Sequence, residues 1–502
     1  MRRKHKLHLN EEEVHPMGIL DDGRWHDRVF TGEWTAAIGG GVRVVREVAT
    51  GAELGRVGLA SADDVTAAGA AAAAAQRDWA ATPFQERAAV LRRAAQLWGT
   101  HADEIGDWIV RESGSLGAKA GFELDYAINE CHEAAALPSM AVGEVIPTPQ
   151  PRLSMVRRMP AGVVGVISPF NAPLILSIRS VAPALALGNA VVLKPDPRTA
   201  VCGGVALARV FQEAGLPAGV LQVLPGDAAV GQALIADPHV RVISFTGSSA
   251  AGCAVGELAG RHLKRVHLEL GGNSALVVLD GADLDAAVGA GAWGTFFHQG
   301  QVCMAPGRHL VHESLYDEYV ERLAAKADHL PVGDPAAGDV ALGPIIDERQ
   351  RDKVHELVTS SVDAGAKLMA GGTYEGLFYR PTVLANAAGS PAYDNEVFGP
   401  VAPVARFGSI DEAVELAADS EYGLSLGILT PDVMKGLELA ERIPTGIVHI
   451  NDQTVSDEPL APFGGILASG TGSRFGGAAA NIEAFTETRW VTVRSTIAGY
   501  PM

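Results

Sequence analysis

The sequence predicts an α/β protein with two α/β domains and a small β arm. Three observations predict this fold class. From residue 162 onward, short runs rich in β-branched residues alternate with helical segments, which is the pattern of a parallel sheet covered on both faces. A second series of strands and helices begins after residue 271. Two extended segments, near residues 139–161 and at the end of the chain, belong to neither series. With 502 residues, the chain exceeds a single hydrophobic core.

The composition restricts the classes of partner. Hydrophobic residues make up 47% and charged residues 20% of the chain, as in globular α/β proteins. The formal net charge of −19 argues against nucleic acid or an anionic membrane as a partner. It still allows an anionic cofactor, because helix N-termini hold phosphates through backbone dipoles. No apolar run approaches the roughly 20 residues of a membrane span, so no membrane partner is expected.

The four cysteines indicate a reducing compartment and no metal site. Cys131, Cys202, Cys253 and Cys303 lack the spacing of a disulfide framework or of zinc ligands. The basic start of the chain, residues 1–6, is not followed by the apolar segment of a signal peptide. We therefore expect a cytoplasmic protein without a structural metal.

The part before residue 137 is predicted to be mostly helical. Residues 1–35 are polar and irregular, which indicates a surface arm, and residues 42–58 alternate as a short hairpin does. Ser61 then has the position of an N-cap before an alanine-rich helix. The three helices expected here cover about residues 62–80, 83–110 and 118–136.

Two extended segments form the predicted arm. A run of prolines marks residues 139–160 as extended chain, which needs a neighbouring subunit or a sheet edge to lean on. Residues 486–493 are predicted to form a last strand that pairs with this arm in an oligomer. A homodimer or homotetramer is therefore expected.

The central part of the chain predicts the parallel sheet. Its strands are short and apolar, and helical segments separate them. The predicted strands are residues 163–167, 190–193, 220–224, 240–245 and 266–270, and the helices are residues 174–187, 200–214, 228–236 and 250–258.

After residue 271 the alternation returns and predicts a second α/β domain, with Cys303 near its start. Its predicted helices are residues 284–297, 315–328, 348–364, 410–418 and 433–443, and its strands are residues 309–312, 401–407, 425–429 and 447–450.

Polar and glycine residues gather just after the strands of the first series. Any strand–helix loop contains some, but five loops with chemically useful side chains indicate a binding site, because ligands bind beyond the carboxyl ends of parallel strands. They are Ser168, Pro169, Phe170 and Asn171 after the first strand, Lys194 and Asp196 after the second, Gly226 after the third, Thr246, Gly247 and Ser248 after the fourth, and Glu269 near the end of the fifth.

Cys303 is the candidate nucleophile. It follows Gly300 and Gln301 in a predicted turn, where a thiol can reach a substrate. The other three cysteines lie in helical Ala/Val contexts, which is typical of buried side chains. The thiolate is the reactive form, and an ordinary cysteine has a pKa of about 8.5. Activation therefore needs a nearby positive charge or dipole.

Glu269 and Asn171 are the candidate base and oxyanion donor. A carboxylate in an apolar strand should have a raised pKa, which suits general-base work near neutral pH. An amide N–H can stabilise the alkoxide that forms when a thiolate attacks a carbonyl. The alternatives are a structural carboxylate that accepts N–H groups from the Gly271–Gly272 turn, and an asparagine that forms a turn or caps a helix.

Lys194 and Asp196 could bind ribose hydroxyls of a dinucleotide. An acidic residue there repels a phosphate on the ribose 2′ oxygen, which favours NAD over NADP. The alternative is a solvated pair at the rim of the sheet. No Gly-x-Gly-x-x-Gly follows a strand. Phosphates could instead bind at helix N-termini, near Gly226 with Gly231 or near Gly247 with Ser248.

Together these motifs resemble the aldehyde dehydrogenase superfamily over about residues 40–490. The segments that carry the resemblance match in order and spacing. They are SPFNAP at 168–173, LKPD at 193–196, FTGS at 245–248, LELGG at 268–272, GQVC at 300–303, EVFGP at 396–400 and PFGG at 462–465.

The resemblance implies a Rossmann-like NAD-binding domain (residues 1–138 and 162–270), a catalytic domain (271–480) and an oligomerisation arm (139–161 and 481–502). It also implies a role for each matched residue. Cys303 would be the nucleophile, Glu269 the base, and Asn171 with the Cys303 backbone N–H the oxyanion hole. The cofactor, NAD with NADP as the alternative, would be bound by Ile167, Ser168, Pro169, Phe170, Lys194, Asp196, Gly226, Gly231, Phe245, Thr246, Gly247, Ser248, Leu270, Glu396 and Phe398.

The implied reaction is the oxidation of an aldehyde to a carboxylic acid. Cys303 would attack the aldehyde to give a thiohemiacetal, hydride transfer would leave a thioester, and Glu269 would activate the hydrolytic water. Three departures from the family pattern bear on specificity. Asp196 stands where a glutamate is common, which weakens the exclusion of NADP. Phe170 stands where a tryptophan is frequent, and Ala172 replaces a larger residue, which could widen the pocket for an aromatic ring.

The segments around Cys303 and residues 450–459 further resemble bacterial benzaldehyde or salicylaldehyde-type dehydrogenases. Arg179 could favour a substrate with a carboxylate or phenolate, or could form a surface ion pair. Candidates for the substrate pocket, with core packing as the alternative, are Phe170, Ile175, Arg179, Phe296, Phe297 and Phe463.

Three other functions remain open from the sequence. A CoA-acylating relative would pass the acyl group to CoA, although Glu269 favours hydrolysis. A semialdehyde dehydrogenase would act on an aliphatic substrate. A non-catalytic binding protein would not need Cys303, Glu269 and Asn171 together.

Overall fold

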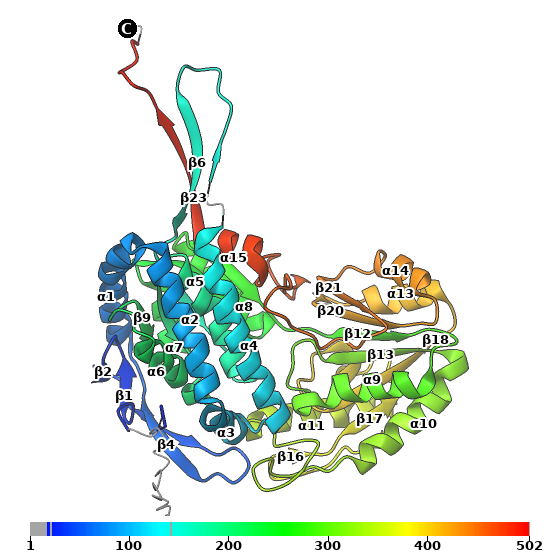
Figure 1. Cartoon of the computed structure of the whole chain (residues 1–502). Helices are drawn as coiled ribbons and strands as arrows, with labels where there is room; N and C mark the ends of the chain where they lie inside the picture. Colours follow the sequence, from blue (N-terminus) through cyan, green and yellow to red (C-terminus); the bar gives the residue numbers. More distant parts are fainter. Residues whose placement is uncertain (1–17, 21–22, 141–142, 501–502) are drawn as a thin grey trace, which may run out of the picture.

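The computed structural model describes residues 18–20, 23–140 and 143–500. The basic segment at residues 1–6 and most of the predicted N-terminal surface arm lie outside these residues. Figure 1 shows two bodies side by side, each built around a β-sheet, with a narrow arm that projects from the first. The predicted α/β fold class is confirmed.

The first sheet has seven strands in the order β11-β10-β7-β8-β9-β1-β2. The five predicted strands are parallel neighbours in it. The expectation of irregular chain before residue 36 is wrong for its last part, because Phe30 pairs with Val223 and extends the sheet by two strands. The strands are β1 (Arg28–Phe30), β2 (Trp34–Ala36), β7 (Val163–Ile167), β8 (Ala190–Lys194), β9 (Leu221–Val223), β10 (Val240–Thr246) and β11 (Arg265–Glu269).

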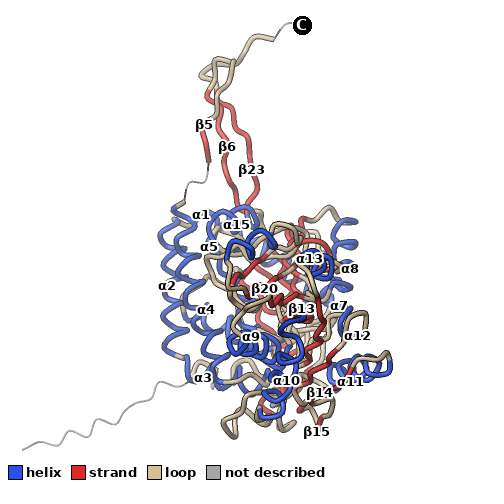
Figure 2. The backbone as a smooth tube through the Cα atoms, turned by 90° about the vertical axis from the view of Figure 1, so that its right-hand side faces the viewer, coloured by secondary structure: helices blue, strands red, loops and turns tan. Residues whose placement is uncertain are grey.

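Helices cover both faces of this sheet, as Figures 1 and 2 show. On one face α5 packs between the sheet and the outer helices α2 and α4, and on the other lie α1, α7 and α8. The helix predicted over residues 83–110 is two helices, because the backbone leaves helical geometry at His101. The helices are α1 (Ala62–Ala81), α2 (Phe84–Thr100), α3 (Ala102–Ser113), α4 (Gly117–Ala136), η1 (Leu137–Ser139), α5 (Pro173–Ala186), η2 (Val201–Val205), α6 (Ala206–Glu213), α7 (Ala228–Ala236) and α8 (Ser249–Arg261).

Three cysteines lie on these helices. Cys131 and Cys202 are buried as expected, whereas Cys253 on α8 is exposed. The expectation of a buried side chain at Cys253 is therefore wrong, because α8 covers the sheet as an outer helix and turns this position to solvent.

The second sheet also has seven strands, in the order β14-β17-β18-β13-β12-β20-β21. Strands β12, β14 and β17 were not predicted, although all five residues of β12 are buried. The strands are β12 (Ser274–Val278), β13 (Pro306–His312), β14 (Lys367–Ala370), β17 (Thr382–Ala385), β18 (Val401–Phe407), β20 (Ser425–Leu429) and β21 (Ile447–Ile450). The helices are α9 (Leu284–Phe296), η3 (Phe297–Gly300), α10 (Glu313–His329), α11 (Glu348–Asp363), α12 (Pro391–Asp394), α13 (Ile410–Ala418) and α14 (Val433–Ala440). The last helix, α15 (Gly477–Phe485), packs against α4 and α5 of the first body.

The projecting arm is a three-stranded antiparallel sheet of β5 (Gly143–Val145), β6 (Leu153–Pro160) and β23 (Thr486–Val493). The tail strand pairs with the arm over its whole length, from Thr486 with Pro160 to Val493 with Leu153. This pairing forms within one chain. The predicted division into a cofactor domain, a catalytic domain and an oligomerisation arm stays a prediction.

Four short strands form two antiparallel pairs, β15 with β16 and β19 with β22, and β3 and β4 form the predicted hairpin near the start. These strands are β3 (Val42–Arg46), β4 (Glu53–Gly58), β15 (Tyr374–Glu375), β16 (Phe378–Tyr379), β19 (Tyr422–Gly423) and β22 (Ile466–Leu467). In the described part of the chain, each helix is too short or too polar to cross a bilayer.

Candidate active site

A cavity of about 150 Å³ lies where the two sheets meet. Cys303 and Asn171 both line it, although 132 positions separate them in the chain. Predicted cofactor residues line it as well: Pro169, Phe170, Thr246, Gly247, Ser248, Leu270, Glu396 and Phe398. The carboxyl edge of the first sheet therefore faces the loop that carries the cysteine.

The loop before Cys303 has an unusual backbone. His298 and Gln299 have φ angles of 48° and 57°, in the left-handed region, which costs energy in residues with a side chain. Buried hydrogen bonds hold this conformation. The Gln299 side-chain amide donates to the carbonyls of Gly114 (2.8 Å) and Pro344 (2.9 Å). The cysteine therefore sits on a loop that distant parts of the fold keep in place.

Asn171 contacts this loop directly. Its side-chain Nδ2 donates a hydrogen bond to the backbone carbonyl of Gln301 at 2.9 Å. A primary amide carries a second N–H, which this bond leaves for another acceptor. The contact fixes the Asn171 side chain two residues from Cys303, on the wall of the same cavity.

A buried ion pair on α4 holds the backbone of Asn171. Lys119 donates to the Asn171 carbonyl at 2.7 Å and pairs with Glu123, four residues further along α4. Glu123 in turn accepts the backbone N–H groups of Leu174 (2.9 Å) and Ile175 (3.3 Å) at the start of α5. Both charged side chains are almost fully buried. Together they fix the turn between β7 and α5, on which Asn171 lies.

Glu269 ends β11 and is 1% exposed. Among the described residues, neither oxygen of its carboxylate has a hydrogen-bond partner of good geometry. Burial raises its pKa to about 8, although Arg179 and Arg474 act in the opposite direction. A carboxyl with this pKa can take up and release a proton near neutral pH.

The thiol of Cys303 is only weakly acidic in this environment. Burial raises its pKa to about 12, and the nearby carboxyls of Glu396 and Glu269 add to the effect, while Arg179 opposes it. An efficient nucleophile therefore needs a further positive charge in the cavity, or a proton acceptor at the moment of attack.

Arg179 on α5 is buried beside both groups, with 1% of its surface exposed. The alternative of a surface ion pair is therefore wrong. Its guanidinium lies over the rings of Phe463 (4.9 Å) and Phe475 (5.0 Å) and donates to Thr246 Oγ1 at 2.9 Å. One nitrogen is 4.0 Å from Asp457 Oδ2, and burial raises the pKa of Asp457 to about 6 despite this charge.

An apolar cluster surrounds Cys303 on the side of the second sheet. Phe463 and Phe297 belong to it, and Phe297 stacks on Trp293 with 4.7 Å between ring centroids. The remaining members are Met304, Leu424, Val455, Val302 and Ile447. The other substrate candidates lie elsewhere: Ile175 is in the core of the first sheet and Phe296 in a core of the second.

Phe170 lines the cavity. Its ring meets Phe398 edge to face with a centroid separation of 5.9 Å, and the Arg198 guanidinium lies over the ring, 4.2 Å from its centroid. Both neighbours come from regions that line the cavity or the wide pocket beside it.

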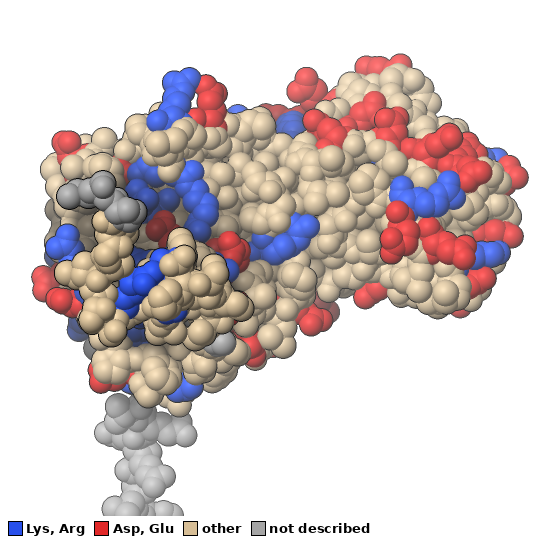
Figure 3. All heavy atoms as spheres, turned by 90° about the horizontal axis from the view of Figure 1, so that it is seen from above, with Lys and Arg blue, Asp and Glu red and all other residues tan. Residues whose placement is uncertain are grey.

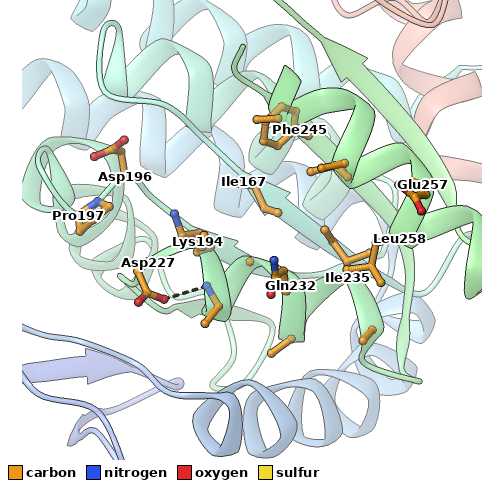
Figure 4. Close-up of a pocket in the computed structure, with 18 of the residues that line it drawn as sticks. Ile167, Lys194, Asp196, Pro197, Asp227, Gln232, Ile235, Phe245, Glu257 and Leu258 are labelled. Carbon is orange, nitrogen blue, oxygen red and sulfur yellow. Dashed lines mark hydrogen bonds between the residues drawn. The ribbon is translucent and has the colours of Figure 1, made fainter. Parts of the chain in front are cut away.

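The wide pocket has a volume of about 1130 Å³ and opens along α7 and α8. Figure 4 shows Ile167 and Lys194 at its centre, Asp196 at one end and Glu257 at the other. Lys194 lines this space, and its charge interacts with Asp196 and Asp227. Five predicted cofactor residues line the pocket: Ile167, Lys194, Asp196, Gly231 and Phe245.

Two predicted cofactor residues line neither space. Ser168 is buried and accepts a hydrogen bond from Ser177 Oγ at 2.8 Å. Gly226 is packed so closely against Val230 that a Cβ atom would lie 2.5 Å from its side chain. Both therefore shape the loops behind the pocket.

Comparison with known proteins decides the class of the chain. The sequence profile of the group described as "Aldehyde dehydrogenase family" matches residues 34–491. The chain belongs to the aldehyde dehydrogenase family.

The relatives of this aldehyde dehydrogenase include enzymes named for aromatic aldehydes. Vanillin dehydrogenase of Amycolatopsis sp. is 74% identical over 486 residues, which are 97% of this chain and 100% of that protein. Benzaldehyde dehydrogenase (NAD(+)) of Pseudomonas putida is 50% identical and covers 95% of this chain and 98% of its own length. The solved structure of a salicylaldehyde dehydrogenase from Pseudomonas putida G7, complexed with salicylaldehyde, has a TM-score of 0.90 and 35% identity, with coverages of 95% and 99%.

Sequence reasoning missed several residues of this aldehyde dehydrogenase site. Lys119 and Glu123 carried a signal, because two opposite charges four positions apart lie on a helix rich in alanine. Arg198, only two residues after Asp196, carried none that separates it from a solvated arginine. Lys353 and Gln350 on α11 also line the cavity, and Lys353 donates to the Glu396 carbonyl at 3.0 Å.

Proposed function

We propose that this protein oxidises an aromatic aldehyde, such as benzaldehyde, to the carboxylic acid with NAD. The observation that carries the proposal is that Cys303 and Asn171, from distant loops, line one cavity, with the buried Glu269 near enough to act on the pKa of Cys303. The relatives named for vanillin and benzaldehyde support the substrate class. The aromatic side chains around Cys303 offer a surface on which a flat ring can pack.

In the proposed reaction, the Cys303 thiol passes its proton to the Glu269 carboxylate, which releases it to solvent, as the sulfur forms a bond to the aldehyde carbon. The resulting alkoxide accepts the second N–H of Asn171 and the backbone N–H of Cys303. A nicotinamide cofactor, held beside Cys303 by Glu396 and Phe398, would supply the hydride acceptor, and Cys303 would then carry a thioester. Glu269 then takes a proton from the water that attacks this thioester. The bond between carbon and sulfur breaks, the carboxylic acid leaves, and Cys303 takes up a proton to become a thiol again.

The two neighbouring spaces fit the cofactor by size and by chemistry. The wide pocket offers an apolar slot between α7 and α8 for a base, and the Lys194 ammonium, which needs an acceptor, for ribose hydroxyls. Ser248 begins α8, whose N-terminus can receive the pyrophosphate. Glu396, whose carboxylate accepts the Gly272 N–H at 3.0 Å, and Phe398 line the cavity beside Cys303, where the nicotinamide end would lie.

We further propose a homodimer or homotetramer in the cytoplasm. The arm leaves apolar side chains of Val145, Leu153, Trp490 and Val493 exposed, which a second copy would cover. The free cysteines suit a reducing compartment.

A panel of aldehydes tests the proposed function. Purified protein is given benzaldehyde, vanillin, salicylaldehyde and succinic semialdehyde, and NADH formation is followed by absorbance with NAD and with NADP. We expect kcat/KM to be highest for the aromatic aldehydes. Cys303→Ala should abolish turnover and leave binding of NAD nearly unchanged, because the thiol forms the covalent bond and does not hold the dinucleotide.

Three results would contradict the proposal. A preference for succinic semialdehyde would favour the semialdehyde alternative. An acyl-CoA product that appears only with added CoA would favour the CoA-acylating alternative. Absence of NADH formation with every aldehyde would favour a non-catalytic binding protein.

A further inference from the structure

We propose that Arg198 recognises the 2′-phosphate of NADP, so that this enzyme accepts NADP beside NAD and Asp196 does not exclude it. The inference rests on the proposed function, which places the adenosine end of the cofactor in the wide pocket next to Lys194. It assigns cofactor selection to a residue outside the predicted set.

Arg198 covers the carboxylate of Asp196. The Arg198 backbone N–H and Nε both donate to Asp196 Oδ1 at 2.9 Å, and Nη2 donates to Oδ2 at 2.8 Å. Each oxygen of Asp196 is therefore already bonded to the guanidinium or to its backbone. Burial would raise the pKa of Asp196, but these hydrogen bonds lower it, so the carboxylate stays ionised and paired.

Because of this pairing, Asp196 presents little free negative charge to a cofactor. Repulsion of a 2′-phosphate by an acidic residue requires an unpaired carboxylate, as in the pattern that favours NAD. Here Arg198 is shared by Asp196 and Asp347, and the charge of Lys194 offsets the remaining carboxylate, so these four side chains together are neutral. Five basic and four acidic side chains line the whole pocket, so the net charge of its lining is positive. The basic residues are Arg43, Lys194, Arg198, Arg261 and Arg349, and the acidic residues are Asp196, Asp227, Glu257 and Asp347.

Arg198 is also placed to bind a phosphate. Its guanidinium lies 4.2 Å from the ring centroid of Phe170, and its side chain lines the pocket and is 30% exposed. A planar guanidinium offers five N–H donors and binds phosphate oxygens in pairs. The partial exposure and the number of donors allow one side of the guanidinium to stay bonded to Asp196 while the other side binds a ligand.

That other side is held by Asp347 at the start of α11. Arg198 Nη1 donates to Asp347 Oδ2 at 2.7 Å, while Asp347 Oδ1 caps α11 by accepting the Gln350 N–H at 2.8 Å. A phosphate dianion is a stronger partner for a guanidinium than a single carboxylate. The 2′-phosphate would therefore take the place of Asp347, and Asp347 tunes the affinity by competing for Arg198.

Direct binding of two small nucleotides tests this assignment without the chemical step. Isothermal titration calorimetry compares 5′-AMP with adenosine 2′,5′-bisphosphate, which differ only in the 2′-phosphate. We expect the wild-type protein to bind the bisphosphate at least as tightly as 5′-AMP. Arg198→Ala should weaken the bisphosphate about tenfold or more, because a charge-assisted bond is lost, and should change 5′-AMP about twofold at most.

Three further variants sharpen the test. Asp347→Asn keeps the oxygen that caps α11 but holds Arg198 less strongly, so the preference for the bisphosphate should rise severalfold. Arg198→Lys keeps the charge without the planar fork and should bind the bisphosphate with an intermediate affinity. Arg261→Ala is the matched control, because Arg261 lines the same pocket but pairs with Glu257 at 2.6 Å, at the end away from Asp196 (Figure 4). It should leave the ratio of the two affinities unchanged.

The results separate this inference from the proposed function. The role of Arg198 alone would be overturned if the wild-type protein bound 5′-AMP but bound the bisphosphate more than tenfold more weakly. It would also be overturned if Arg198→Ala and Arg198→Lys each lost affinity for both nucleotides equally. If Arg198→Ala does not fold, judged by its thermal melt, an unchanged ratio in Asp347→Asn and Arg198→Lys would overturn it as well. Failure of the wild-type protein to bind 5′-AMP would contradict the cofactor site itself, and the inference would fall with it.

Discussion

Glu269 unites three properties that a general base in a covalent mechanism needs. It is buried, its carboxylate has no hydrogen-bond partner of good geometry in the described chain, and burial raises its pKa to about 8. A carboxylate fully engaged by the Gly271–Gly272 turn would have a lowered pKa and weak basicity. The absence of such contacts with the turn among the described residues supports the proposed role as base, although the Gly465 backbone lowers the pKa of Glu269 in part.

The raised pKa of Glu269 predicts how turnover depends on pH. The base must be ionised, so kcat for hydrolysis of the thioester should increase with pH up to about 8 and then level off. Glu269→Gln should lower kcat about 100-fold or more, remove this limb of the profile and let the acyl-enzyme accumulate. Stopped-flow kinetics with mass spectrometry of the protein measures all three, and normal turnover of the variant would exclude Glu269 as the base.

The raised pKa of Glu269 also makes the stability of the fold depend on pH. Between the ordinary glutamate pKa of 4.5 and about 8, the folded protein keeps a proton that the unfolded chain has lost. The contribution of this group to stability is therefore complete below pH 4.5 and decreases as the pH rises through the window.

At the level of elements, α4 connects the oxyanion side chain to the rest of the first body. Lys119 and Glu123 lie one turn apart on this helix and together bind the Asn171 carbonyl and the start of α5. A buried charge without its partner is costly, whereas removal of both charges costs less. The pair thus acts as a unit that positions Asn171.

Single substitutions should expose this coupling. Lys119→Met or Glu123→Gln should each lower the free energy of unfolding by about 3–5 kcal/mol, because one buried partner loses its contact. The double variant should lose less than the sum of the two, as urea denaturation can measure. Where Lys119→Met folds, kcat should decrease while the affinity for 5′-AMP stays constant; strictly additive losses would show that the two residues act independently.

On the scale of the whole molecule, charge and apolar surface are distributed unevenly. Seen from above, acidic side chains dominate the end that carries the second sheet (Figure 3). The arm of β5, β6 and β23 projects from the opposite body, and Trp490 on its surface is 61% exposed. An antiparallel sheet with one long unpaired edge is a natural surface for association with a second copy.

Substitution on the arm should change the size of the assembly. Trp490→Asp places a charge on the exposed apolar face and should reduce the mass in solution from a multiple of the 52.3 kDa chain to a smaller species. Light scattering after size-exclusion chromatography measures this mass. Met434→Asp is the control, because Met434 is 63% exposed on α14, far from the arm (Figure 1). Equal masses for both variants and the wild-type protein would remove the arm from the interface.

The sequence by itself determined the α/β class, most strands of both sheets and the two loops of Asn171 and Cys303 that line one cavity, since these rest on local periodicity and on motifs of a few adjacent residues. It did not reveal β12, whose short apolar run resembles any buried segment, or β1, whose pairing with β9 joins residues almost 200 positions apart.

Only the tertiary structure decided the environment of the charged residues. Whether Arg179 is buried, whether Lys119 holds Asn171 and whether Asp196 is covered by Arg198 and Asp347 depend on contacts between segments that are distant in sequence. Spacing along the chain does not encode such contacts, because they arise from packing of whole elements. Candidates for the chemistry could therefore be named from the sequence, and their roles stay predictions, but the neighbours that set their charge could not be named.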